Sequence, residues 1–261
     1  MASDKLKLLP SVLLLLSCFA SPYLMANSAE ERLEHAADAY YEGKFQEAAA
    51  LYQAVIEEQG WENASLFLNL GNSFYKSGER GKALAAYFRA FALNPRDAGV
   101  LQNIQMALAA NRDAIEWVWP EPSWVKYFSL YGYVSKKELV YLTGFAIMFC
   151  GVIFGIWALR RDSGNGLKIV AISFAVLGLY GIVASILQHK LWPHWGAVSA
   201  ETAKIYSSPS ERSGLVLFEL SEGAPVIVKE HRDGWRRIQI SDRKQGWIAM
   251  DQLGFLDVDF E

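Results

Sequence analysis

Residues that could carry chemistry are few and lie far apart along the chain. The four histidines fall in three separate segments, so we do not expect a shared metal site; they are His35, His189, His194 and His231. His231-Arg232-Asp233 has the letters of a kinase catalytic loop, but it precedes Gly-Trp in a strand-rich stretch and every other kinase element is missing. The sequence has no Walker A loop, G-x-G-x-x-G, H-E-x-x-H or C-x-x-C motif. We therefore expect no enzyme, cofactor or metal.

The remaining candidates are amides and aromatic rings suited to hydrogen bonding. Six of them are expected to lie off the apolar packing stripe of their helices, and these are Tyr40, Tyr41, Asn69, Asn72, Lys76 and Asn103. Asn69 and Asn103 are one helical repeat apart, which places two amides in a row. The functional interpretation is hydrogen bonding to an extended peptide, and the alternative is a solvated helix face. Because this region is acidic with few bases, a carboxylate-clamping groove is not expected. The net charge of −3 and the lack of a basic patch also argue against nucleic acid.

The helices that would position these side chains resemble tetratricopeptide repeats (TPR). Residues 64–97 match the repeat in both of its helices, through Phe67, Leu70, Gly71, Phe74, Ala83, Tyr87, Ala90 and Pro95. A looser copy precedes it, with Gly43-Lys44-Phe45 as the turn, and Ala98–Asn111 resembles a closing helix. A repeat cannot bury its own apolar face, so a cap is needed. The sequence predicts a TPR α-helical solenoid over residues 28–113.

Two apolar runs follow, each of about 20 residues, the length that a helix needs to cross a bilayer. They are residues 139–159 and 169–187, and neither contains a charged residue. We expect a two-helix transmembrane hairpin. Small residues stand one turn apart at Gly151 and Gly155, and again at Ala171 and Ala175. They could serve the hairpin itself or the docking of a partner's helix, and the sequence leaves both open.

The loop at residues 160–168 carries three basic residues, so it is expected to be cytoplasmic. Residues 1–26 have the layout of a secretory signal, with cleavage expected after Ala26 or, as a second choice, Ala20. Lipidation at Cys18 and an uncleaved anchor remain alternatives. Both cues predict a multi-pass protein of the bacterial inner membrane whose flanking domains face the periplasm. Cys18 and Cys150 are the two cysteines, and both lie in apolar runs, so no disulfide is expected.

Residues 114–138 are rich in tryptophan and tyrosine, with Pro120 and Pro122 breaking any long helix. Such rings sit at headgroup depth in membrane proteins, so we expect a membrane-proximal anchoring segment. An aromatic ligand site is the alternative.

The last region, residues 196–256, changes to short β-branched and aromatic runs separated by turns. It resembles a small bacterial SH3-like β-barrel, on the residues Gly223, Val226, Val228, Gly234, Trp235, Ile238, Gly246, Trp247, Ile248 and Leu253. Tyr206-Ser207 replaces the valine–arginine pair that is usual in the opening strand. Tyr206, Trp235 and Trp247 could form a ligand platform, but in so small a barrel we expect the tryptophans to fill the core.

The whole order of parts, a multidomain chain that is α first and β last, resembles the BatE-type membrane proteins of the Bacteroides aerotolerance group. That resemblance implies a non-enzymatic scaffold in an envelope-stress or aerotolerance complex. The implied partners are von Willebrand factor A-domain membrane proteins and a MoxR-type AAA+ ATPase. The alternative function is a cell-wall sensor that binds peptidoglycan through the SH3-like domain.

Overall fold

The structure is a computed structural model of the 261-residue chain, and it describes residues 29–116, 133–159, 165–191 and 194–254. The predicted signal segment and its possible lipidation at Cys18 lie outside the described residues, as does most of the aromatic segment. The same holds for residues 160–164 of the predicted cytoplasmic loop.

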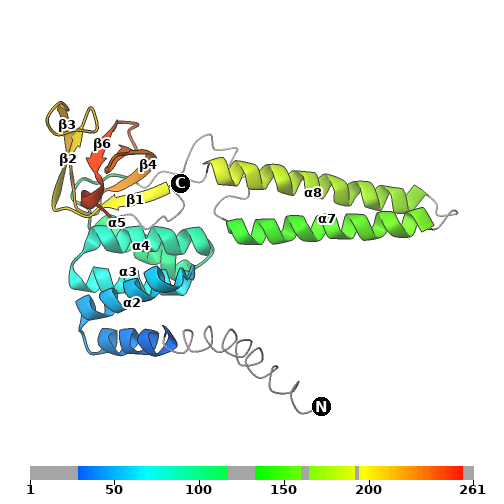
Figure 1. Cartoon of the computed structure of the whole chain (residues 1–261), viewed down its shortest axis with the longest axis horizontal. Coiled ribbons are helices and arrows are strands. Elements are labelled where there is room, and N and C mark those ends of the chain that lie inside the picture. The colour runs from blue at the N-terminus through cyan, green and yellow to red at the C-terminus, as the bar shows by residue number, and fades with distance from the viewer. Residues whose placement is uncertain (1–28, 117–132, 160–164, 192–193, 255–261) are drawn as a thin grey trace, which may run out of the picture.

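The N-terminal region is a stack of antiparallel helices (Figure 1). They are a helix over residues 29–41, α2 (Phe45–Gln59), α3 (Ala64–Ser77), α4 (Arg80–Leu93) and α5 (Ala98–Ala109). The boundaries follow from local chemistry. Asn63 caps α3 by accepting from Ser65 N at 2.8 Å, and Asp97 caps α5 through Gly99 N and Val100 N. Gly78 ends α3 in the left-handed region at φ 93°.

The core of this helical unit lies between α3 and α4. Phe67, Leu70, Tyr87 and Phe91 are almost completely buried there. A Cβ atom on Gly71 would lie 2.4 Å from the Tyr87 ring. The two helices can approach so closely because position 71 has no side chain.

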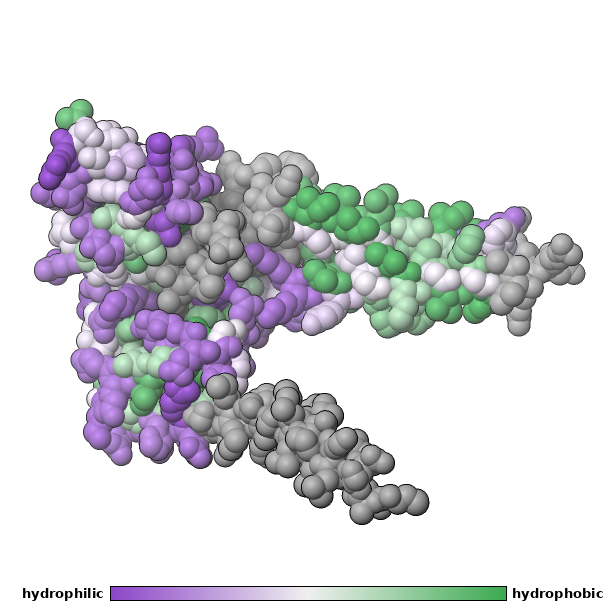
Figure 2. Space-filling model, in the orientation of Figure 1, coloured by the Kyte–Doolittle hydropathy of each residue, from purple (hydrophilic) through white to green (hydrophobic). Residues whose placement is uncertain are grey.

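Two long apolar helices extend away from this unit (Figures 1 and 2), namely α7 (Lys136–Leu159) and α8 (Asn165–Leu191). Both are long and apolar enough to cross a membrane, and most of their apolar side chains are exposed, so they are not core helices. A capping box starts α7, since Ser135 N donates to Glu138 Oε2 at 2.9 Å and Glu138 N donates to Ser135 Oγ. Glu138 also pairs with Arg96 at the α4–α5 turn, which attaches α7 to the helical unit.

In the described part of the chain, seven strands form one antiparallel sheet in the order β3-β2-β6-β5-β4-β1-β7. Their bounds are β1 (His194–Val198), β2 (Thr202–Tyr206), β3 (Val216–Ser221), β4 (Pro225–Arg232), β5 (Trp235–Gln239), β6 (Gln245–Ala249) and β7 (Leu253–Gly254), with the short helix η1 (Met250–Gln252) before β7. One face encloses a small aliphatic core that includes Ile205, Val226, Ile238 and Ile248. The sequence analysis had predicted no separate strand at the position of β1, which begins at His194.

The β-sheet packs directly on the helical unit through β1 and α4. Trp195 lies against Phe88 and Phe91, with ring centroids 5.7 and 5.8 Å away, and belongs to the helical core. A Cβ atom on Gly81 would lie 1.9 Å from Val198 O, so glycine is needed where α4 meets the strand. The helical unit and the sheet therefore pack against each other as one body, from which α7 and α8 extend.

Polar contacts also join the two parts. Asp113 accepts from Ser221 N at 2.6 Å and from Ser221 Oγ at 2.9 Å. Glu222 Oε1 accepts from Gly81 N at 3.2 Å, so a carboxylate of the sheet domain caps the positive end of the α4 dipole. These contacts hold the sheet domain in a single orientation on the helices.

Candidate functional site

The predicted polar face of the helical unit contains a connected hydrogen-bond network. Asn72 Oδ1 accepts two bonds, one from Tyr87 Oη at 3.0 Å and one from Asn103 Nδ2 at 2.9 Å. These residues come from α3, α4 and α5, so the network joins three consecutive helices. Burial of Tyr87 raises the pKa of its hydroxyl well above the ordinary value, and the neighbouring Tyr40 and Tyr75 raise it further.

A second contact of the same kind lies one repeat earlier. Burial raises the pKa of Tyr52, the nearby Tyr41 and Tyr40 add to the rise, and a hydrogen bond with the Asn69 side chain partly opposes it. By position along the chain, Tyr52 on α2 and Asn69 on α3 correspond to Tyr87 on α4 and Asn103 on α5, but the Tyr87 hydroxyl donates to Asn72 and not to Asn103. The sequence analysis did not select Tyr52 or Tyr87 as polar site residues, although their spacing of 35 positions was a usable signal.

The six predicted side chains differ in their exposure and in which hydrogen-bonding groups remain available to a ligand. Tyr41 is 85% exposed, Asn69 and Lys76 are exposed, and Tyr40 packs edge-on against both Tyr41 and Phe45. Asn72 and Asn103 are half-buried and bonded to each other. Because both lone-pair directions of Asn72 Oδ1 are taken, this side chain offers only its N–H groups to a ligand. The face can therefore hydrogen-bond an extended backbone through donors, acceptors and rings, with Lys76 as its charged member among the predicted six.

The aromatic residues of the sheet lie on the face opposite its aliphatic core. Strand alternation puts Ile238 and Ile248 on one face, and Trp235 and Trp247 on the other. Tyr206 pairs with Trp247 across β2 and β6, and its ring meets Trp235 edge-on at 5.5 Å. Trp247 is buried, as expected of a core residue, and Trp235 is half-buried; both lie on the face opposite the aliphatic cluster. The three aromatic side chains form one patch across three strands.

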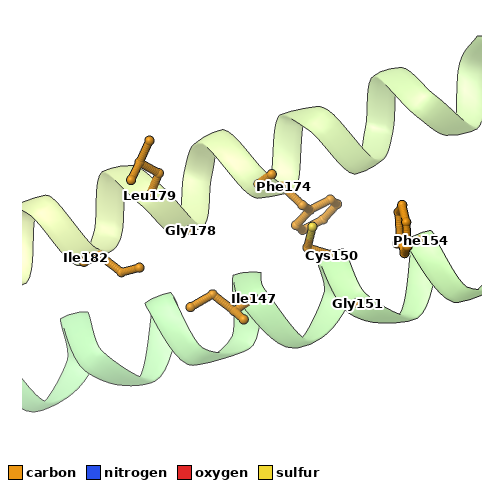
Figure 3. A pocket seen from close by; sticks show the side chains of 9 residues that line it. Ile147, Cys150, Gly151, Phe154, Phe174, Gly178, Leu179 and Ile182 are labelled. Atoms are coloured by element: carbon orange, nitrogen blue, oxygen red, sulfur yellow. The ribbon is translucent and has the colours of Figure 1, made fainter.

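The small residues of the α7–α8 hairpin divide into two groups. A Cβ atom on Gly151 or Gly155 would meet nothing within 4 Å, whereas one on Gly181 would lie 2.3 Å from Thr143 Oγ1. The close contact between the helices is thus at Gly181 and Gly178, which the sequence analysis did not select. Gly151 and Ala175 instead line an open apolar groove of about 540 Å³ between the two helices, together with Phe154, Phe174 and Leu179 (Figure 3).

Ala171 takes part in the hairpin contact through its backbone. Cys150 Sγ lies 3.6 Å from the carbonyl oxygen of Ala171, where it can donate a weak hydrogen bond. Of the four predicted packing residues, Ala171 therefore touches the opposite helix in this way, while Gly151 and Gly155 leave space for an added side chain.

A comparison with protein families decides the identity of the C-terminal domain. Residues 199–253 match the family described as Bacterial SH3 domain. The match covers β2 to β6 and the first residue of β7, and β1 with its Trp195 lies before it. No curated protein matches the chain. A bacterial SH3 domain is consistent with binding to protein or to peptidoglycan.

The described residues also give a limit on metal chemistry. Within residues 29–116, 133–159, 165–191 and 194–254, no three His, Cys, Asp or Glu side chains come together as a metal ion would require.

Proposed function

We propose that this protein is a membrane-anchored, non-enzymatic scaffold that binds an extended peptide of a partner protein on its helical unit. In this proposal α7 and α8 cross the bacterial inner membrane, and the TPR-like helices and the SH3-like domain face the periplasm. The exposed apolar surface of α7 and α8 supports the anchoring, since such a surface is stable in lipid and not in water.

The observation that carries the binding proposal is the bonded series of side chains across the helices. Amide groups lie at a repeat spacing on one face of the helices. Asn69 is bonded to Tyr52, and Asn72 accepts from both Tyr87 and Asn103. The hydroxyls orient the amides, so the remaining donors and acceptors are positioned before a ligand arrives. A preorganised polar face loses less entropy on binding than a mobile one.

The partners proposed are von Willebrand factor A-domain membrane proteins acting with a MoxR-type AAA+ ATPase. The support is the order of helical repeats, membrane hairpin and SH3-like domain, which is similar to the order in BatE-type proteins. The docking of the sheet domain on α4 adds to this proposal, because a partner would meet one rigid surface in place of two independent modules.

Crosslinking in intact membranes followed by affinity purification tests this function. The informative variant is Asn69→Ala with Lys76→Ala, because both side chains are exposed and the bonds to Asn72 stay intact. We expect loss of the A-domain partner at a temperature where both variants stay folded, since Asn69→Ala also removes the hydrogen bond to Tyr52 and lowers the unfolding midpoint modestly. The matched control is Glu57→Ala with Lys82→Ala, two exposed residues on α2 and α4. Equal recovery of the partner by both variants would overturn the proposal.

Peptidoglycan binding by the SH3-like domain is the second candidate function. The aromatic patch of Tyr206, Trp235 and Trp247 favours it, since rings on an outer sheet face can stack on sugars or peptides. The full chain in detergent should then sediment with purified cell wall, and Trp235→Ala should release it. The full chain is required because a separated sheet domain would expose Trp195.

A further inference from the structure

The turn between β4 and β5 carries an unusual concentration of positive charge. Residues 229–237 read KEHRDGWRR, with four basic and two acidic side chains in a chain whose net charge is −3. Asp233 and Gly234 have φ of 45° and 80°, and Arg232 pairs with Trp235 across them, so they form a tight two-residue turn. We call residues 229–237 the basic hairpin.

Three of its cations are not neutralised by acidic side chains. Arg237 pairs with Glu230 at 3.2 Å, but Lys229, Arg232 and Arg236 form no ion pair with the described residues. Lys229 and Arg232 are exposed to water, where a charged side chain needs no ion-pair partner. Arg236 is different, because it is only 8% exposed.

Arg236 occupies a position where strand alternation calls for an apolar side chain. It shares the core face of β5 with Ile238 and lies between His231 on β4 and Ile248 on β6. Its Nε is buried without a hydrogen-bond partner, and Nη1 reaches only the Trp235 carbonyl oxygen, at 3.5 Å. A buried guanidinium without an anion is unfavourable, because no opposite charge offsets its desolvation. Arg236 is thus a buried cation that no acidic side chain of the described residues neutralises, and an external anion would relieve it.

The strand register places the basic hairpin beside the end of α8. β1 begins at His194, three residues after α8 ends at Leu191, and runs away from that helix (Figure 1). β4 is antiparallel to β1 and returns toward α8, with Val228 opposite His194. Residues 229–232 continue beyond that pair by about 13 Å of strand. In a chain whose α8 crosses the bilayer, this end of the sheet is the one that faces the membrane surface.

We propose that the basic hairpin binds the phosphates of anionic phospholipid headgroups, with Arg236 as the buried ligand on the core face and Lys229 and Arg232 as exposed cations that contact neighbouring headgroups. The inference rests on the membrane-spanning part of the proposed function. Anionic headgroups attract juxtamembrane lysine and arginine, and each such residue contributes about a fivefold gain in lipid affinity. Binding would orient the SH3-like domain on the membrane, and through β1 and α4 it would also orient the helical unit.

The test uses the full-length protein in nanodiscs of phosphatidylcholine, with or without phosphatidylglycerol. We expect phosphatidylglycerol to raise the thermal unfolding midpoint and to be retained in native mass spectrometry. Lys229→Gln with Arg232→Gln should weaken retention by roughly 25-fold, at about fivefold per cation. Arg236→Leu should weaken it by about fivefold and should raise the midpoint in phosphatidylcholine, because the uncompensated charge is gone. Lys204→Gln, an exposed lysine on β2, is the matched control and should change nothing.

Equal retention of phosphatidylglycerol by the wild type and both hairpin variants would overturn the inference. So would an equal shift of the midpoint by inorganic phosphate in phosphatidylcholine discs, or a shift caused only by a carboxylated wall peptide. The double variant alters exposed side chains alone, so the test stands even if Arg236→Leu does not fold. Alkaline carbonate extraction of membranes checks the anchoring separately. A protein that resists extraction but shows no lipid preference contradicts only the headgroup site.

Discussion

Asn72 and Asn103 are 31 positions apart in the sequence and are joined by a 2.9 Å hydrogen bond from Asn103 Nδ2 to Asn72 Oδ1. The same oxygen accepts from the buried Tyr87 hydroxyl. The pair thus has a structural role within a face that we propose as a binding surface. A variant at Asn72 or at Asn69 changes stability as well as any ligand contact, because each removes a hydrogen-bond partner of a buried tyrosine, whereas a variant at the exposed Lys76 does not.

Asn72→Ala should lower the free energy of unfolding by about 1–3 kcal/mol, because the Tyr87 hydroxyl is left buried without its acceptor. Tyr87→Phe in the same chain should restore part of this loss by removing the orphaned group. Denaturant unfolding of the two single variants and the double variant measures the coupling. Strict additivity of the two effects would show that the bond contributes nothing.

Trp195→Ala should cost about 3–5 kcal/mol, because it empties the space between Phe88 and Phe91 in the helical core. Since Trp195 belongs to β1, we also expect the sheet domain to separate from α4 and new protease sites to open. Limited proteolysis with thermal unfolding checks both effects. Lys82→Ala, exposed on the same helix, is the control and should leave the digestion pattern unchanged.

Gly181→Val should disrupt the pairing of α7 and α8, because its Cβ would meet Thr143 Oγ1 at 2.3 Å. Gly151→Val has open space around the added side chain and should leave the hairpin intact. Thermal unfolding of the two variants in detergent separates them. The prediction is wrong if Gly151→Val destabilises the protein as much as Gly181→Val does.

Stability should fall at alkaline pH through Tyr87. Its pKa is raised in the folded chain, so above about pH 10 the unfolded chain loses a proton that the folded chain keeps. Tyr87 therefore contributes its full stabilisation below about pH 10, and this stabilisation decreases as the pH rises toward the pKa of Tyr87 in the folded chain. Absorbance titration of tyrosinate should show late-titrating groups, the latest of which Tyr87→Phe removes. A titration curve unaltered by that substitution would contradict the assignment.

Several parts of the fold could be read from local chemistry. Gly71 and Tyr87 had to pack together because the repeat pairs a missing side chain with a large ring, and the structure confirms this contact. The two apolar helices followed from length and composition, and the SH3-like strands followed from their β-branched runs and turns. Each of these properties depends on residues within a short window.

Other features depended on contacts between distant segments. Strand alternation alone did not reveal which face of β5 and β6 carries the aliphatic cluster. Both tryptophans were expected to fill the core; Trp247 is buried, but on the face opposite that cluster, and Trp235 is only half-buried. Gly151 and Gly155 had the spacing of a helix-packing motif, but a Cβ atom added at either position would touch nothing. Gly178 and Gly181 of α8 make the close contact with α7 instead.

The sequence by itself determined the kinds of element, their order and the pair of long apolar helices, because propensity, capping and hydrophobic length act locally. Only the tertiary structure decided that Trp195 completes the helical core, that Asn72 is shared by Tyr87 and Asn103, and that Arg236 is buried without an acid. The first depends on the docking of β1 against α4, two elements more than 100 residues apart in the chain. The second depends on how α3, α4 and α5 stack, and the third on the register of β4, β5 and β6. Each is set by the mutual fit of surfaces, which a local sequence pattern does not encode.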